Sequence, residues 1–202
     1  MNRRGILGAA VAAGLVELAP ETSEAALLCT PFVPPGLQQC DVGIASAIAA
    51  VNAPAQDETE WCWAACIEAV FRYYGHPVPQ ARIVAETWGT VVNLPADPRK
   101  ILVDLNRPWI DDFGRSFGVA GDVLTANAIT ASQDLALNMP LIIGTMGHAM
   151  VLTRLQFVRD AMGREDIKAA YVRDPWPGRG FRMLTPQEWY ATMFLVRIRV
   201  QV

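Results

Sequence analysis

Apolar residues in the first half of the chain recur at helical spacing. One set follows the three- and four-residue steps of a single helical face: Cys62, Ala65, Cys66, Ala69, Val70 and Tyr73. Gly75 and Pro77 then act as stop signals, so the pattern predicts a buried helix of about three to four turns that starts at or just after a capping Thr59. Further helices are predicted over residues 79–88, 97–105 and 125–138.

The second half of the chain changes to strand-like runs. They cover residues 141–144, 148–157, 167–173, 181–184 and 194–202. The last run alternates apolar and charged residues from Val196 to Val200, as a strand with one wet face does. Helices followed by strands predict an α+β fold. We expect one compact domain over residues 51–202, with a helical lobe at about 51–138 and an antiparallel β lobe at about 139–202.

The chain opens with the layout of an export signal. Arg3 and Arg4 precede an uncharged apolar run over residues 5–16, and small residues follow at 23–26. This predicts a signal peptide over residues 1–28, of twin-arginine type, and hence a periplasmic or secreted protein. The run is too short to cross a hydrocarbon core of about 30 Å, so no stable membrane span is expected. The alternative is an N-terminal core helix, which the Gly and Ala content of the run disfavours.

Residues 29–50 are predicted to form an N-terminal arm that contains Cys29 and Cys40. Export would permit disulfides, and the Pro- and Gly-containing stretch from Thr30 to Leu37 cannot pack much by itself. We therefore expect a Cys29–Cys40 disulfide that closes this loop. Three interpretations stay open for the arm: a propeptide, a disulfide-tied extension, or part of the fold.

Charge and motifs exclude several classes of function. The formal net charge is -3, and Lys and Arg are scattered along the chain, so no electrostatic footprint for nucleic acid is present. The sequence has neither a glycine-rich phosphate loop nor a dinucleotide fingerprint. A zinc site built from Cys62, Cys66 and the two histidines, His76 and His148, is disfavoured by their spacing. No cofactor or metal is expected.

Cys62 falls in the first turn of the predicted central helix. Unpaired backbone N–H groups and the helix dipole converge there, and both favour the nucleophilic thiolate. Cys66 lies one turn deeper and is interpreted as a small core residue, because buried cysteines in apolar surroundings are inert. Position alone would also fit a buried Cys62.

The sequence around Cys62 resembles the nucleophile segment of papain-like cysteine peptidases. The string Trp61-Cys62-Trp63-Ala64-Ala65-Cys66 is similar to that of compact bacterial secreted and effector members, and Gln56 precedes Cys62 by the spacing seen in the family. The resemblance implies that the Gln56 side-chain amide and the Cys62 backbone N–H hold the oxyanion of the tetrahedral intermediate. Trp61 and Trp63 are assigned packing around the nucleophile.

His148 is the predicted general base. His76 lies at the far end of the nucleophile's own helix, roughly 20 Å from Cys62, and cannot reach it. His148 starts a strand after a short loop, and the segments 140–144 and 147–152 resemble the histidine region of the same bacterial peptidases. The imidazole would take the thiol proton and later protonate the leaving amine.

Asp174 is the predicted third member of the triad. It ends a strand expected to pair with the histidine strand, and the string from Asp174 to Gly178 resembles the Asp-Pro segment of these enzymes, although papain has asparagine here. The alternative is an aspartate that merely starts a Pro-Gly turn. Glu188 is assigned to a capped surface helix that begins at Thr185, and Asp111 and Asp112 to a solvated loop.

The resemblance runs from about Gln56 to Glu188 and implies a peptidase. The reaction would be hydrolysis of an amide bond in a protein or peptide substrate through a thioester acyl-enzyme. Two alternatives stay open. The same triad can serve an acyltransferase or a cell-wall peptide amidase, or the fold can be a catalytically silent binding module.

Overall fold

The computed structural model describes residues 27–44 and 54–201. Most of the predicted signal peptide, residues 1–26, and the end of the arm, residues 45–50, lie outside the described residues. Among the described residues, no helix is long and apolar enough to cross a membrane.

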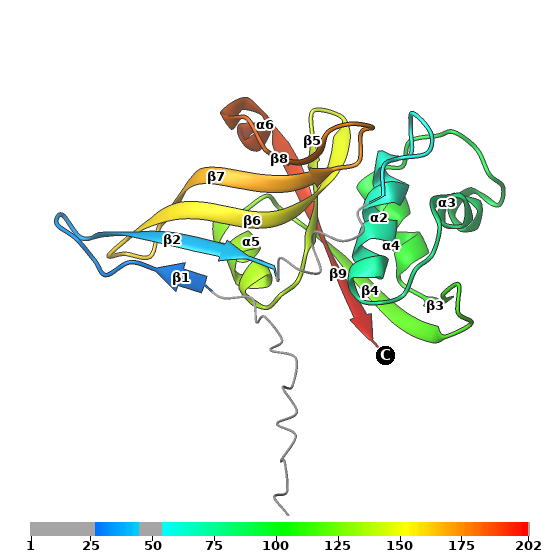
Figure 1. The fold of residues 1–202 in the computed structure, drawn as a ribbon, viewed down its shortest axis with the longest axis horizontal. Helices are drawn as coiled ribbons and strands as arrows, with labels where there is room; N and C mark the ends of the chain where they lie inside the picture. Colours follow the sequence, from blue (N-terminus) through cyan, green and yellow to red (C-terminus); the bar gives the residue numbers. More distant parts are fainter. Residues whose placement is uncertain (1–26, 45–53, 202) are drawn as a thin grey trace, which may run out of the picture.

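One antiparallel sheet runs through the molecule (Figure 1). Its strands are β1 (Leu27–Cys29), β2 (Leu37–Gly43), β3 (Pro108–Ile110), β4 (Ser116–Leu124), β5 (Leu141–Thr145), β6 (His148–Asp160), β7 (Glu165–Asp174), β8 (Gly180–Met183) and β9 (Thr192–Gln201). They are ordered β1-β2-β6-β5-β9-β4-β3, and β7 pairs with both β6 and β8. The long strand β6 therefore bonds to β5 near His148 and to β2 and β7 farther along.

Five described helices accompany the sheet. They are α2 (Cys62–Tyr73), α3 (Gln80–Trp88), α4 (Pro98–Leu105), α5 (Ala128–Ala136) and α6 (Pro186–Tyr190). Asp97 caps α4, with Pro98 in its first turn, and Asn127 caps α5. Helices α2, α3 and α4 gather at one end of the molecule in Figure 1, whereas α5 lies beside β2, β6 and β7.

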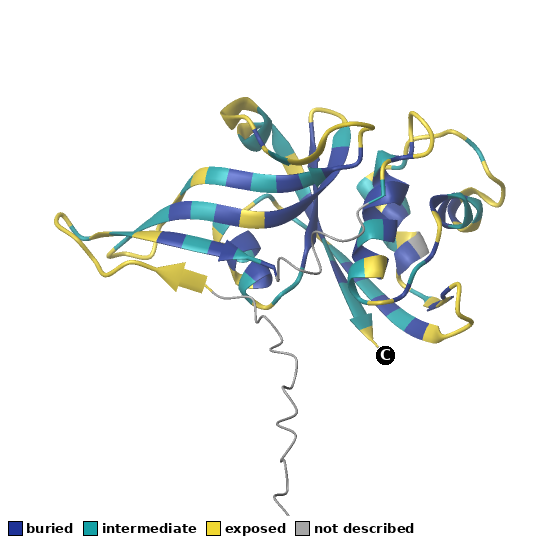
Figure 2. Ribbon diagram, in the orientation of Figure 1, coloured by how far each residue is buried: buried dark blue, intermediate teal, exposed yellow. Residues whose placement is uncertain are grey.

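The two hydrophobic cores lie on opposite faces of the same strands. Adjacent residues alternate between them: Val151 and Val196 belong to the core that contains α2, and Leu152 and Leu195 belong to the core that contains α5. This is the alternation that successive side chains of a strand must show. Strand β5, residues 149–153 of β6 and residues 195–196 of β9 are thus buried on both sides. Figure 2 shows buried residues as dark bands.

The α+β class and the antiparallel sheet are as predicted, but the separation into a helical first half and a β second half is wrong. Strands β1 to β4 all precede residue 138. Within β4, Gly118 and Gly121 weaken the strand signal. Gly121 has a packing role, because a Cβ there would lie 3.1 Å from Leu102 Cδ2 of α4. The central helix also begins later than predicted, at Cys62 and not beside Thr59.

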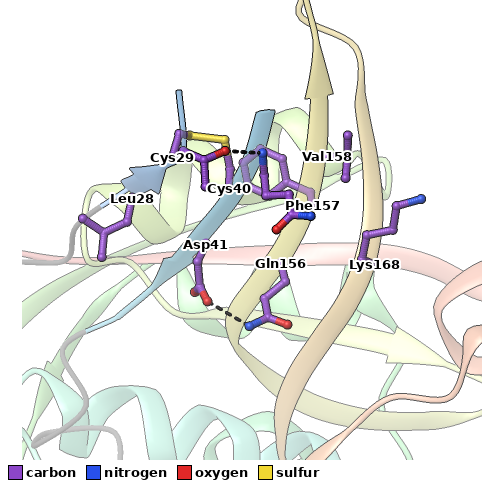
Figure 3. Close-up of a pocket in the computed structure, with 10 residues that line it drawn as sticks. Leu28, Cys29, Cys40, Asp41, Gln156, Phe157, Val158 and Lys168 are labelled. Carbon is purple, nitrogen blue, oxygen red and sulfur yellow. Dashed lines mark hydrogen bonds between the residues drawn. A yellow bond between two sulfur atoms is a disulfide. The ribbon is translucent and has the colours of Figure 1, made fainter. Parts of the chain in front are cut away.

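The described part of the N-terminal arm belongs to the fold. The predicted Cys29–Cys40 disulfide is present and joins β1 to β2 (Figure 3). Strand β2 in turn pairs with β6 along its whole length, and Gln156 donates a hydrogen bond to the Asp41 carboxylate across that pair. Residues 37–43 are therefore an integral strand of the sheet.

Candidate active site

Cys62 is the first residue of α2 and is partly exposed. No side chain caps this end of the helix. The backbone N–H groups of the first turn therefore have no side-chain acceptor that competes with the Cys62 sulfur or a substrate. Cys66, one turn deeper, is fully buried, and burial raises the pKa of its thiol. The two free cysteines thus have opposite environments, and only Cys62 is accessible to a substrate.

A tight hairpin turn places His148 opposite α2. Strands β5 and β6 are joined by Met146 and Gly147, both with positive φ, at 50° and 77°. Positive φ at both central residues is the type I′ geometry that matches the twist of a two-residue hairpin. This turn fixes His148, the first residue of β6, at the end of the β5–β6 strand pair.

His148 and Asp174 are hydrogen-bonded. The distance from His148 Nε2 to Asp174 Oδ1 is 2.7 Å, and the Asp174 side chain is fully buried. Since Asp174 occupies Nε2, Nδ1 is the nitrogen left to face the Cys62 sulfur. Burial favours the neutral ring, but the bonds to Asp174 and Cys62 outweigh it and raise the pKa of His148 to about 9.

Asp174 is held as a carboxylate by several donors. Besides His148, Oδ1 accepts from the Trp176 backbone N–H at 2.9 Å, and Oδ2 accepts from Arg182 Nε at 2.8 Å. Burial alone would raise the pKa of Asp174, but these donors together hold it well below its ordinary value. The arrangement keeps a negative charge against the imidazole.

Arg182 is a site residue that the sequence did not reveal. Its guanidinium bridges Asp174 to Glu188, with distances to Glu188 Oε1 and Oε2 of 2.6 and 3.0 Å. Glu188 does lie in the predicted capped helix, where it forms a capping box with Thr185. It is also an ion-pair partner, and Arg182 lowers the pKa of Glu188 to about 2.

Gln56 lies in the loop that leads to α2 and is buried. Its backbone N–H donates to Pro175 O at 2.7 Å, so the loop is fixed to the segment that follows Asp174. Its side-chain Nε2 donates to the carbonyls of Glu58 and Thr59, each at 2.9 Å, and Oε1 is buried without a partner. Both amide hydrogens are thus engaged within the loop in this conformation.

A loop over residues 89–97 is bonded to the start of α2. The indole N–H groups of Trp61 and Trp63 donate to Val92 O and Leu94 O at 2.8 and 3.2 Å. The Asn93 side chain accepts from the Glu60 backbone N–H and donates to the Thr59 hydroxyl. The two tryptophans therefore position one wall of the site in addition to packing in the core.

Cys62 and His148 line a common cleft of about 730 Å³. One wall comes from the 89–97 loop and α4, and the other from β5, β6, β9 and the segment after β7. At the floor, the Phe194 ring lies against the β5 backbone at Gly144, where a Cβ would come within 2.1 Å of Cζ. Much of the lining is apolar, including Pro95, Ala96, Ile101, Ile142, Ala149 and Met193.

His76 lies away from the cleft lining, and the assignment of Asp111 to a solvated loop is wrong. Asp111 is buried, and its Oδ2 lies 3.0 Å from His76 Nδ1. It also accepts hydrogen bonds from the backbone and guanidinium of Arg115. Within the described ranges, no group of three or more His, Cys, Asp or Glu side chains is arranged to hold a metal ion.

Comparisons with known proteins show likeness in structure. No family model matches the sequence, and no curated protein does so at a significant level. The peptidase domain of Streptococcus ComA, a bi-functional ABC transporter involved in quorum sensing, superposes with a TM-score of 0.51 at 14% identity. That match covers 73% of this chain and 96% of the ComA domain.

A second structure is similar at a lower score. It is a double glycine motif protease from an AMS/PCAT transporter, in complex with the leader peptide, with a TM-score of 0.47 and 20% identity over 76% of this chain and 92% of that one. The mixed helices, the large antiparallel sheet and the superposition on the ComA domain together show that this chain has the predicted papain-like α+β fold.

Proposed function

We propose that this protein is a cysteine peptidase with Cys62 as nucleophile, His148 as general base and acid, and Asp174 as the residue that orients the imidazole. The observation that carries the proposal is that His148 is hydrogen-bonded through Nε2 to buried Asp174 and lines one cleft with Cys62, which is partly exposed at the start of α2. A raised His148 pKa favours the thiolate–imidazolium pair that attacks a carbonyl carbon.

In the proposed reaction, His148 serves both proton transfers of peptide hydrolysis. The Cys62 sulfur adds to the scissile carbonyl, and His148 then gives its proton to the leaving amine as the thioester forms. Water, deprotonated by His148, hydrolyses the thioester and regenerates the thiol. The Cys62 backbone N–H, at the free end of α2, is the first oxyanion donor. Gln56 becomes the second when substrate binding exchanges one of its carbonyl bonds for the oxyanion.

We also propose that the protein works outside the cytoplasm. The N-terminal sequence motivates this, and the Cys29–Cys40 disulfide agrees with it, since such bridges persist in oxidising compartments. The substrate is taken to be a protein or peptide, in keeping with the names of the two similar structures, a peptidase domain and a protease bound to its leader peptide.

The test is cleavage of a peptide library by the full chain with its disulfide formed. Mass spectrometry of new termini should show cleavage by the wild type, none by Cys62→Ala, and retention by Cys66→Ala, the same substitution one turn deeper. Products joined to an added amine would indicate acyl transfer. Complete absence of Cys62-dependent products, together with iodoacetamide labelling of Cys62 that is no faster than for a free thiol, would contradict catalysis and favour a silent binding module.

A further inference from the structure

The turn after β7 places an aromatic and a cationic side chain at the rim of the cleft. Arg179 N–H donates to Trp176 O at 3.0 Å, Pro177 and Gly178 stand between them, and Gly178 has φ 81°. Pro followed by a residue with positive φ at the two central positions is the type II β-turn. Trp176 and Arg179 are therefore held together, and both line the cleft that contains Cys62 and His148.

The Arg179 guanidinium has hydrogen-bond donors that Asp174 does not occupy. The Asp174 carboxylate already receives His148 at 2.7 Å and Arg182 Nε at 2.8 Å, whereas Arg179 Nη1 lies 3.5 Å from Oδ2. The Arg179 side chain is 55% exposed, compared with 21% for Arg182. A guanidinium has five N–H donors in a fork that matches a carboxylate. Arg179 thus lines the cleft with a guanidinium that is largely exposed.

The chemistry of the proposed reaction tells which part of a substrate meets this turn. His148 must protonate the leaving amine, so the residues after the scissile bond pass the imidazole. The Trp176 ring lies edge-on to His148, with ring centroids 6.2 Å apart. Arg179 Nη1 and His148 Nε2 lie 3.5 and 2.7 Å from the two oxygens of the same Asp174 carboxylate, so the guanidinium is close to the imidazole. At roughly 3.3–3.6 Å per extended residue, its guanidinium is within reach of the first three residues of the leaving segment.

We infer that Arg179 selects substrates that carry a carboxylate within the first three residues after the scissile bond. The carboxylate is either an Asp or Glu side chain or the free C-terminus of a short leaving segment. This inference rests on the proposed peptidase function and assigns its leaving-group specificity. Trp176 supplies an apolar surface beside the same residues, so the turn favours segments that combine an apolar and an acidic group.

The experiment compares cleavage sites of the full chain and of Arg179→Glu in one peptide library made from a proteome digest. The wild type should enrich Asp and Glu at the first three positions after the cut, and Arg179→Glu should replace this preference with Lys and Arg. A cleaved peptide is then resynthesised with the acidic residue changed to its amide. For the wild type, kcat/KM should be about five-fold higher for the acidic peptide than for its amide. The ratio of these two values should be near one for Arg179→Gln and inverted for Arg179→Glu.

A second arm separates the two sources of the carboxylate. Short substrates with a free or an amidated C-terminus, and no acidic side chain after the cut, show whether the terminal carboxylate alone is recognised. Ratios of kcat/KM are used because any disturbance of Asp174 by an Arg179 substitution would lower both members of a pair equally. Arg164→Glu, at the distant β6–β7 turn, makes the same change in net charge and should keep the wild-type ratio.

The two proposals fail in different ways. If no peptide is cleaved in a Cys62-dependent manner, the peptidase function itself is contradicted. If cleavage occurs but wild type and Arg179→Glu share one residue preference after the cut, or if Arg164→Glu changes the ratio as much as Arg179→Glu does, only the role of Arg179 is overturned.

Discussion

At the scale of single residues, the charge of His148 determines how the site can work. Its pKa is raised to about 9 because its bonds to Asp174 and Cys62 outweigh its burial. The folded value lies above the ordinary one of 6.5, so the proton is retained through neutral pH and lost as the pH rises toward 9. Above that pH the imidazole can no longer protonate a leaving amine.

We therefore predict an alkaline limb near pH 9 in the wild-type profile of kcat/KM. Asp174→Asn removes the negative charge that holds the imidazolium, so its limb should move to lower pH and kcat should fall by roughly 10²- to 10⁴-fold. Rates measured between pH 6 and 10 test this. Profiles with the same limb in both proteins would mean that Asp174 does not set the His148 pKa.

The sequence was sufficient to choose three residues that lie close together in the fold, because each stands in a short distinctive string. Cys62 and His148 line one cleft, and buried Asp174 hydrogen-bonds to His148. Arg182 stands in no such string, and its contact with Asp174 depends on the pairing of β7 with β8, in which Arg182 faces Val172. The engagement of Gln56 with Glu58 and Thr59 is likewise a property of the folded loop.

At the scale of elements, the short helix α6 supports the end of β7 through β8. Glu188 of α6 holds Arg182 of β8, which holds Asp174 at the end of β7. Thr145 of β5 and Thr192 of β9 both donate hydroxyl hydrogen bonds to Glu188 O, so α6 is fixed to two further strands. Asp174 is thus positioned by Arg182 of β8 and Glu188 of α6. Neither of these residues belongs to the nucleophile helix α2.

We predict that Arg182→Gln destabilises the protein by about 3 kcal/mol, because it removes the closer ion-pair partner of a buried carboxylate oxygen. Glu188→Gln should cost less, since Arg182 can still reach Asp174. Urea denaturation measures both, with Arg164→Gln as the control for loss of an exposed ion pair. Equal free energies of unfolding for Arg182→Gln and Arg164→Gln would contradict the support assigned to Arg182.

The elements that the sequence did not predict are those defined by their partners. Strand β4 contains two glycines, and one of them is required by the close approach of Leu102 from α4. Strand β1 has three exposed residues and exists through its pairing with β2 and the disulfide. The amphipathic helices were predicted because their periodicity is local, whereas these short strands depend on residues that are distant in sequence.

At the scale of the whole molecule, the Cys29–Cys40 disulfide should contribute stability without contributing to the cleft. By loop-closure entropy, its reduction or the change of both cysteines to Ala should lower the free energy of unfolding by about 2–3 kcal/mol. Strand β2 should stay in place through its pairing with β6. Urea midpoints with and without reductant test this, and peptide cleavage per folded molecule serves as the control. An unchanged midpoint would show that the bridge is dispensable.

Strand β9 comes late in the chain but lies inside the sheet, between β5 and β4. It pairs with β5 on one side and with β4 on the other, and so joins the part of the sheet that carries His148 to the part beneath α4. Without β9, strands β4 and β5 would each have an unpaired edge. Such edges can pair with strands of other chains and cause aggregation. The pairing of β9 therefore covers two strand edges at once, so loss of this one strand would expose both of them.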